Sequence, residues 1–319
     1  MNSTLSPLEA SFAINDYYIA SSLSSVISLI AVFISIFVPI LAYRTKPRLH
    51  TVRHLLICNT CVASILYCIV QTINYAFLIF LQSETSDVGC RWRGYFAYLS
   101  IAAVAYSYLI QAISRFFISI LSGQYRWLTT FKTHYILILL QWVTIVVIPL
   151  PSILTNDIYY RPSSLCWVPL KKLIHVIYSY SAYYIVPTSS VCIIYIFIFY
   201  RVKKFSHRSC TFARPTNKEK RDLELLRNIM ALLFIYLLGG TPSILFVITA
   251  SKPIYLLSLV TMSLSVAIEK ISMIMLDRDI RQAVMKLLLS TKPTLQVKPI
   301  QKTYVQSTVA KKYSALNNL

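Results

Sequence analysis

The chain alternates long runs of apolar residues with short segments rich in charge. Six runs contain no Lys, Arg, Asp or Glu, and each exceeds the roughly 20 residues that a helix needs to span a 30 Å hydrocarbon core. A seventh run is interrupted only by Glu269 and Lys270. Because open sheets cannot satisfy their backbone in lipid, and the runs lack the short alternation of barrel strands, the pattern predicts an all-α membrane protein of seven helices. The runs are 17–43, 54–83, 94–114, 133–156, 173–200, 228–251 and 253–276.

Composition and charge place these helices in a membrane with a defined orientation. Of the 319 residues, 56% are hydrophobic and 13% are charged, against about 25% charged in soluble chains. Counted over alternate connections, 24 Lys and Arg fall on one side and six on the other. The positive-inside rule then predicts an extracellular N-terminus and a cytosolic C-terminus. The net charge of +20 favours contact with anionic membrane lipid over nucleic acid, which is not expected as a partner.

The same pattern divides the chain into four segments. We expect an extracellular N-terminus over 1–16, a seven-helix domain over 17–276, an amphipathic helix over 277–290 and a disordered cytoplasmic tail over 291–319. The amphipathic helix would lie on the inner leaflet. Its apolar face holds Ile280, Val284, Leu287 and Leu288, and the lipid phosphates are within reach of Arg278, Arg281 and Lys286.

One cation in the third run needs an explanation. Arg115 follows Cys90 by 25 residues, which a helix covers in about 37 Å, so Arg115 lies at the cytosolic mouth if Cys90 lies at the outer surface. An ordinary Arg that snorkels at a helix end is one reading. Cys90 and Cys166 both fall on the oxidising side, so a disulfide between them is permitted.

Several residues stand at characteristic spacings along the runs. Cys90 at the top of the third run is followed by Arg115 after 25 residues and by Cys166 in the second outer connection. The fourth run carries Trp142, the fifth has Pro187 with Tyr195 eight residues on, Asp222 precedes Pro242 of the sixth by twenty residues, and the second holds Asn59 and Ala63. In these positions residues 20–290 resemble the rhodopsin-like family of G-protein-coupled receptors, whose helices carry the same residue types at these spacings.

The resemblance implies a receptor at the plasma membrane that transmits binding of an extracellular ligand to a heterotrimeric G protein. It implies that the resting state pairs Arg115 with Asp222 across helices three and six. Opening of helix six about Pro242 would break that pair and expose Arg115 to the G protein. The positions assigned to coupling and switching are Arg115, Asp222, Tyr195, Pro187, Pro242, Glu269 and Ser64.

The chain also departs from the family pattern. The triplet Ser114-Arg115-Phe116 lacks the usual acidic neighbour of the arginine, and Gly240 replaces the helix-six tryptophan. In helix seven, the family's asparagine, proline and tyrosine correspond to Glu269, Lys270 and Met273.

Glu269 is the candidate for a buried charge in the switch, because Ser64 stands where the family has a sodium-binding Asp in helix two. We expect Glu269 to face the interior of the bundle and to hydrogen-bond Ser64 or Asn59, directly or through water. Lys270 is about 100° further round the helix and is expected to snorkel towards the cytosol or to meet a neighbouring helix. Alternatively, the two charges merely mark the end of a shortened span.

The resemblance limits the class of ligand mainly through binding residues of the family that this chain lacks. Ala97 occupies the position of the amine-binding Asp, and Ser263 occupies that of the retinal-binding Lys, so monoamines and retinal are both disfavoured. A peptide and a small molecule both remain open. Candidate ligand-binding residues in the outer half are Tyr98, Ile101, Trp167, Tyr183 and Val247, although aromatic side chains there equally suit packing or interfacial anchoring.

Two other classes of function fit the sequence less well. A transporter or channel is the alternative to a receptor. The chain shows no self-similar halves, however, and its number of spans is odd, whereas transporters are often built from repeats. An enzyme is disfavoured because His, Glu and Cys form no cluster at metal-ligand spacing, and the five His are scattered near helix ends. The sequence therefore predicts no cofactor, no metal and no catalytic residue.

Overall fold

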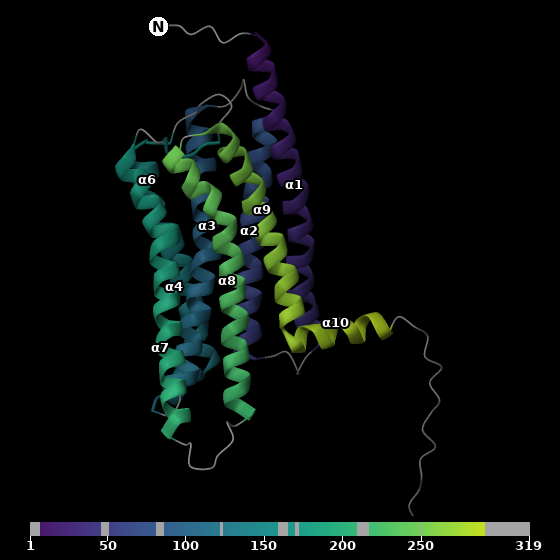
Figure 1. Cartoon of the computed structure of the whole chain (residues 1–319), viewed down its shortest axis with the longest axis vertical. Helices are drawn as coiled ribbons and strands as arrows, with labels where there is room; N and C mark the ends of the chain where they lie inside the picture. Colours follow the sequence, from purple (N-terminus) through teal and green to yellow (C-terminus); the bar gives the residue numbers. More distant parts are fainter. Residues whose placement is uncertain are drawn as a thin grey trace, which may run out of the picture. The chain divides into compact units, whose positions relative to one another are not determined.

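The computed structural model describes residues 7–45, 51–80, 86–121, 124–158, 165–169, 172–208, 217–249 and 251–290. Within these ranges the chain forms helices and connecting turns and no strand (Figure 1). The α-helices are α1 Pro7–Arg44, α2 Val52–Phe80, α3 Asp87–Phe116, α4 Phe131–Val147, α5 Leu150–Leu154, α6 Leu173–Tyr180, α7 Val186–Arg208, α8 Asn217–Thr249, α9 Lys252–Leu276 and α10 Arg278–Ser290. Shorter helical turns are η1 Phe117–Leu121, η2 Arg126–Thr129 and η3 Ser181–Ile185.

Seven helical rods in the described ranges are long and apolar enough to cross a membrane, which confirms the predicted fold class. Three of them consist of more than one element: α3 continues into η1, α4 into α5, and α6 through η3 into α7. The seventh rod, α9, runs unbroken through Glu269 and Lys270. The two ends of the bundle are called the Cys90 end and the Arg115 end, after the residues near the two ends of α3.

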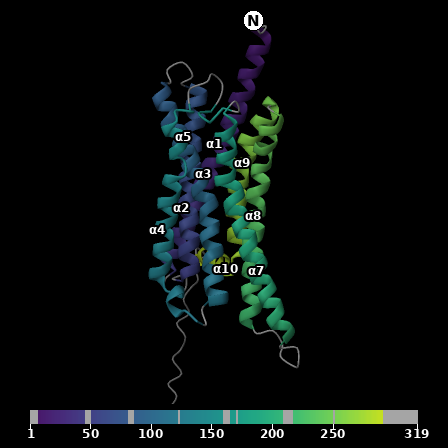
Figure 2. The ribbon, with the colours of Figure 1, turned by 90° about the vertical axis from the view of Figure 1, so that its left-hand side faces the viewer.

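α3 is the central helix of the bundle. In its apolar window 78% of the residues are buried, more than in any of the other six spans. Its buried positions include many small residues, among them Ala97, Ser100, Ala102 and Ala103. Small side chains let neighbouring helices approach closely, and α3 accordingly contacts α2, α4 and α7. On another side, α8 and α9 lie side by side in both views (Figures 1 and 2).

The fifth rod is irregular where it carries its tyrosines. η3 is a single π-helical turn in which the backbone N–H of Val186 donates to the carbonyl of Ser181, five residues earlier. Pro187 follows at once and has no N–H for the usual bond to the carbonyl four residues back. A π-turn of this kind rotates the preceding side chains relative to a regular helix and is frequent at functional sites.

The short helix predicted after the seventh span is α10. Asp277 has an extended backbone at the end of α9, and its Oδ1 accepts from the N–H groups of Asp279 at 3.0 Å and Ile280 at 3.2 Å. This is an N-cap, which satisfies donors that the first turn of a helix leaves unpaired. The side chain of Leu288, residues 1–6 and the predicted tail 291–319 lie outside the described residues, and the membrane position of α10 stays a prediction.

Candidate functional site

The segment 165–169 is held across the Cys90 end of the bundle. Cys166 forms a disulfide with Cys90 in the first turn of α3, with the two Cα atoms 5.3 Å apart, so the disulfide predicted from sequence is present. The backbone N–H of Val168 donates to the Tyr98 hydroxyl at 3.1 Å. A Cβ at Gly94 would collide with the carbonyl of Cys166, so the absence of a side chain there lets the segment lie against α3.

Aromatic side chains fill the space below this segment. Tyr98 of α3 stacks on Tyr183 of η3 with ring centroids 5.3 Å apart, and Trp167 lies 6.1 Å from Tyr98. Three of the five candidate ligand residues therefore form one cluster. Ile101 is buried on α3, whereas Val247 is half-buried in the last turn of α8, outside these ring contacts. The contacts are those of a packed cluster, and a role in ligand binding stays a prediction.

A tyrosine from the fifth rod occupies the space next to Gly240, where the family pattern has tryptophan. A Cβ added at Gly240 would lie 2.7 Å from Cε1 of Tyr184. Tyr184 stacks on Tyr236, one turn earlier in α8, with centroids 6.0 Å apart, and Tyr236 in turn lies 6.1 Å from Tyr108 of α3. The missing bulk of helix six is thus supplied from helix five, and the three rings form a continuous row.

The row of tyrosines leads to a buried ion pair in α9. Glu269 is 1% exposed and Lys270 is fully buried, and the Lys270 ammonium lies 3.0 Å from both carboxylate oxygens. Tyr108 lies beside Glu269 on the wall of one cavity. Of the two alternatives expected for Lys270, snorkelling to the cytosol was wrong, because the side chain is fully buried. Contact with a neighbouring helix stays a prediction. The Lys270 ammonium folds back on its own neighbour, because two opposite charges neutralise each other more cheaply than a lysine at this depth can reach water.

Asn59 and Ser64 of helix two, the expected partners of Glu269, do not bond to it. The Asn59 amide donates to Gln141 Oε1 at 2.7 Å, and its oxygen accepts from Trp142 Nε1 at 3.1 Å. Ser64 is buried and its hydroxyl has no hydrogen-bond partner among the described residues. A direct bond from Glu269 to Asn59 or Ser64 is therefore absent, because Asn59 is turned towards α4 and Lys270 already holds the carboxylate. Glu269 is buried and paired, as expected, but its partner is Lys270 and not a residue of helix two.

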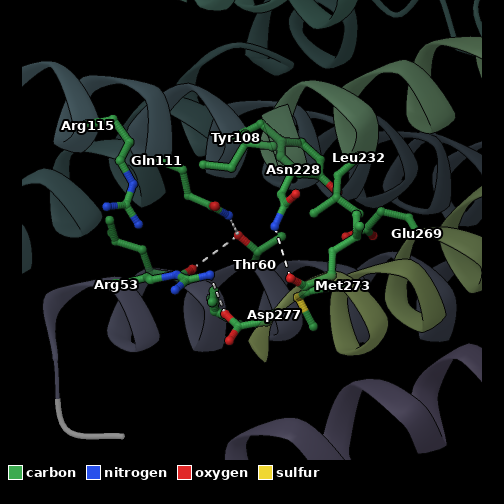
Figure 3. Close-up of a pocket in the computed structure, with 14 residues that line it drawn as sticks. Arg53, Thr60, Tyr108, Gln111, Arg115, Asn228, Leu232, Glu269, Met273 and Asp277 are labelled. Atoms are coloured by element: carbon green, nitrogen blue, oxygen red, sulfur yellow. Dashed lines mark hydrogen bonds and ion pairs between the residues drawn. The ribbon is translucent and has the colours of Figure 1, made fainter. Parts of the chain in front are cut away.

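A partly open cavity lies at the Arg115 end of the bundle (Figure 3). Its walls come from α2, α3, α8 and α9, and several polar bonds cross between them. The Gln111 amide donates to Thr60 Oγ1 at 2.6 Å, and the Asn228 amide donates to the carbonyl of Leu276 at 3.0 Å. Arg53, Arg115, Glu269 and Asp277 supply its charges, against an apolar remainder of Leu56, Ile57, Ile229, Leu232, Met273 and Leu276.

The remaining switch positions lie in different parts of the bundle. Arg115 is half-buried on the α3 wall of this cavity. Tyr195 is buried in a core cluster between α3, α7 and α8, and Pro187 is buried at the start of α7. Pro242 lies inside α8. Asp222 belongs to the first part of α8, but its side chain lies outside the described residues, so its pairing with Arg115 stays a prediction.

Sequence reasoning missed Tyr184, Tyr236 and Tyr108. With 23 Tyr in the chain, residue type alone could not separate these three from interfacial anchors. A usable signal was present for one of them, since Tyr236 precedes the anomalous Gly240 by four residues and so lies on the same helical face. The contribution of Tyr184 depends on the π-turn of η3, which periodicity does not reveal.

An acid at the Cys90 end gives a test by pH. The hydrogen bond from Thr155 at 2.6 Å lowers the pKa of Asp157, and Lys172 and His175 add to this effect at 3.4 Å and 3.0 Å. A depressed carboxyl pKa contributes stability that is complete above the unfolded value near 3.9 and is lost as pH falls through the folded value. Asp157→Asn should therefore lower the Tm of the solubilised protein at pH 7, and the difference from wild type should shrink below about pH 4. Asp16→Asn in α1 is the control, and a difference constant with pH would contradict the assignment.

The architecture has seven apolar rods, a disulfide-bonded segment over one end and a cavity with charged residues at the other. This arrangement fits a seven-helix membrane receptor. The profile of the family described as 7 transmembrane receptor (rhodopsin family) matches residues 21–274, and the chain belongs to that family. It is a multi-pass membrane protein of a receptor family. No individual curated protein matches the chain.

Proposed function

We propose that the chain is a plasma-membrane receptor that couples an extracellular ligand to a heterotrimeric G protein. The proposal rests on the family and on one observation above all: Arg115 stands on the wall of a cavity lined by residues of α2, α3, α8 and α9. Movement of α8 away from α9 would break the Asn228 contact with Leu276 and widen the cavity. A cavity that opens when one helix moves is a two-state element that a ligand can bias.

The orientation follows from charge. Cations concentrate in the connections on the Arg115 side of the chain, so the N-terminus is extracellular and the C-terminus cytosolic. The disulfide-bonded segment then faces outside, where oxidation is favoured, and the cavity faces the cytosol and the G protein. The ligand is a peptide or a small molecule other than a monoamine or retinal, as Ala97 and Ser263 indicate.

Basal nucleotide exchange tests the cytosolic switch. Asp222→Ala should raise basal G-protein activation, because it removes the carboxylate proposed to hold Arg115 at rest. Arg115→Ala should lower coupling several-fold while surface expression stays at the wild-type level. Both are measured as GTP exchange on G proteins added to purified receptor in nanodiscs. Unchanged GTP exchange in both variants would mean that Arg115 has no role in the switch and only anchors a helix end at the membrane surface.

The competing function is transport or ion conduction. Charge deep in a span is the feature that would favour it, but in this chain Glu269 and Lys270 neutralise each other at 3.0 Å. A panel of ligand classes read out by second messengers should find one that activates the wild type and not Arg115→Ala. A substrate flux or current through protein in liposomes without any G protein would replace the receptor proposal with the transport one.

A further inference from the structure

A histidine in the first turn of α2 holds a ring nitrogen that has no hydrogen-bond partner among the described residues. His54 is 4% exposed, and its Nδ1 lies 2.7 Å from Thr51 Oγ1. Its Nε2 is buried and has no hydrogen bond within the described part of the chain. A buried polar atom without a partner costs free energy unless a ligand or water satisfies it. Thr51 accepts the proton of Nδ1 in one tautomer, which leaves the lone pair of Nε2 available to a Lewis acid.

Two carboxylates from the α9 to α10 junction face this ring. One ring nitrogen of His54 and one oxygen each of Asp277 and Asp279 all lie within 4.8 Å of one another. Asp277 is almost fully buried, and its Oδ1 is committed to capping α10. Its Oδ2 remains as a possible metal ligand, and the half-exposed Asp279 can turn towards it. His54 belongs to α2, whereas Asp277 and Asp279 stand at the start of α10, more than 200 residues later in the sequence.

We propose that His54, Asp277 and Asp279 form a binding site for a divalent transition metal of the zinc class, with water at the fourth position. One imidazole nitrogen with two carboxylates suits Zn²⁺ or Co²⁺, whereas Mg²⁺ and Ca²⁺ prefer all-oxygen sites of six or more ligands. Ligand atoms around tetrahedral Zn²⁺ are about 3.3 Å apart for bonds near 2.0 Å. The three ligand atoms lie at most 4.8 Å from one another, so side-chain rotations can bring them to the distances that Zn²⁺ requires. Donation from Nδ1 to Thr51 would orient the ring, as outer partners of metal-bound histidines do.

Arg53 contacts both carboxylates. Its Nη2 lies 2.7 Å from Asp277 Oδ2, and its Nη1 lies 3.9 Å from Asp279 Oδ2. A metal would have to displace this guanidinium, whose side chain is 21% exposed and borders the cavity of Figure 3. A dication can replace one cation at two carboxylates without leaving them uncompensated. Arg53 is therefore a competitor for the proposed metal, and removing it in the titration separates a metal site from a plain ion-pair network.

Metal titration of the full-length receptor in nanodiscs tests the site independently of G-protein coupling. Zn²⁺ should bind saturably and raise the Tm, and Co²⁺ should give the ligand-field absorption of a nitrogen and oxygen site. His54→Ala and Asp279→Asn should each weaken binding roughly tenfold or more, and Arg53→Gln should tighten it by about tenfold, since a competing cation is removed. Asp277 is left intact because it caps α10.

The matched control is His175→Ala at the Cys90 end, where a histidine also faces an acid, Asp157, at 3.0 Å. That variant should bind Zn²⁺ as wild type does. Asp279→Asn changes a half-exposed side chain, so it gives a folded comparison if His54→Ala expresses poorly. Zn²⁺ affinity that is equal in wild type, Asp279→Asn and Arg53→Gln would overturn the proposal, as would absence of saturable binding.

Discussion

Replacing Lys270 by Met should destabilise the receptor by about 3 to 5 kcal/mol, the cost of leaving one member of a buried ion pair without its partner. Glu269 would then stand 1% exposed beside a methionine, with Tyr108 on the same cavity wall. Loss of surface expression and a lower Tm in detergent are the expected results. The effect comes from the uncompensated carboxylate, because Met retains most of the apolar volume of the lysine stem.

The double variant Glu269→Gln with Lys270→Met separates this cause from misfitting of the side chain. Both charges are then gone, and most of the lost stability should return, as is found when buried pairs are replaced by neutral residues of similar volume. Lys252→Met, at an exposed position in the first turn of α9, should leave Tm unchanged. Equal losses in the single and double variants would show that packing, and not charge, limits this position.

Placing tryptophan at Gly240 should destabilise the protein by about 3 kcal/mol or more, because overpacking a filled core forces neighbouring side chains and backbone to move. Even a methyl group there would lie 2.7 Å from the ring of Tyr184. Tm and surface expression measure the effect. The variant is informative because it restores the residue that the family pattern has in helix six.

Tyr184→Ala is the compensating change. In the double variant the indole can enter the volume that the Tyr184 ring vacates, so stability should recover in part. Gly89→Ala in the exposed first turn of α3, where the nearest atom to a new Cβ is Ser86 Oγ at 3.3 Å, is the control and should cost little. No recovery in the double variant would mean that Tyr184 does not fill the tryptophan position, and the alignment of helix six would need revision.

The sequence predicted the helices of this protein, the disulfide and the continuity of the seventh span. The seven spans were predictable because a helix in lipid satisfies its backbone within itself, each N–H bonding the carbonyl four residues earlier. An apolar run long enough to cross the membrane is then sufficient to define a span. The disulfide was predictable because the sequence places Cys90 and Cys166 on the oxidising side, where a bond is permitted, and because the resembling family has a Cys at both positions. The interruption at Glu269 and Lys270 was correctly included in a span, and α9 is continuous there.

The partners of individual polar side chains were not predictable in the same way. Asn59 turned out to contact Gln141 and Trp142 of α4, although family resemblance suggested the neighbourhood of Glu269. Helical periodicity states which residues share a face of one helix, but not the rotation and vertical register of that helix against its neighbours. A rotation of one residue, about 100°, is enough to exchange one hydrogen-bond partner for another.

The amino-acid sequence by itself determined that this is a seven-helix membrane protein, which residues lie in the spans, and that two charges enter the seventh one, because length, hydropathy and backbone satisfaction act within single helices. Only the tertiary structure decided that Lys270 neutralises Glu269, that Tyr184 fills the space at Gly240, and that His54 meets Asp277 and Asp279. Each of these depends on a side chain's rotamer or on the packing of helices distant in sequence. Those are set by close packing of the whole bundle and leave no periodic trace along the chain.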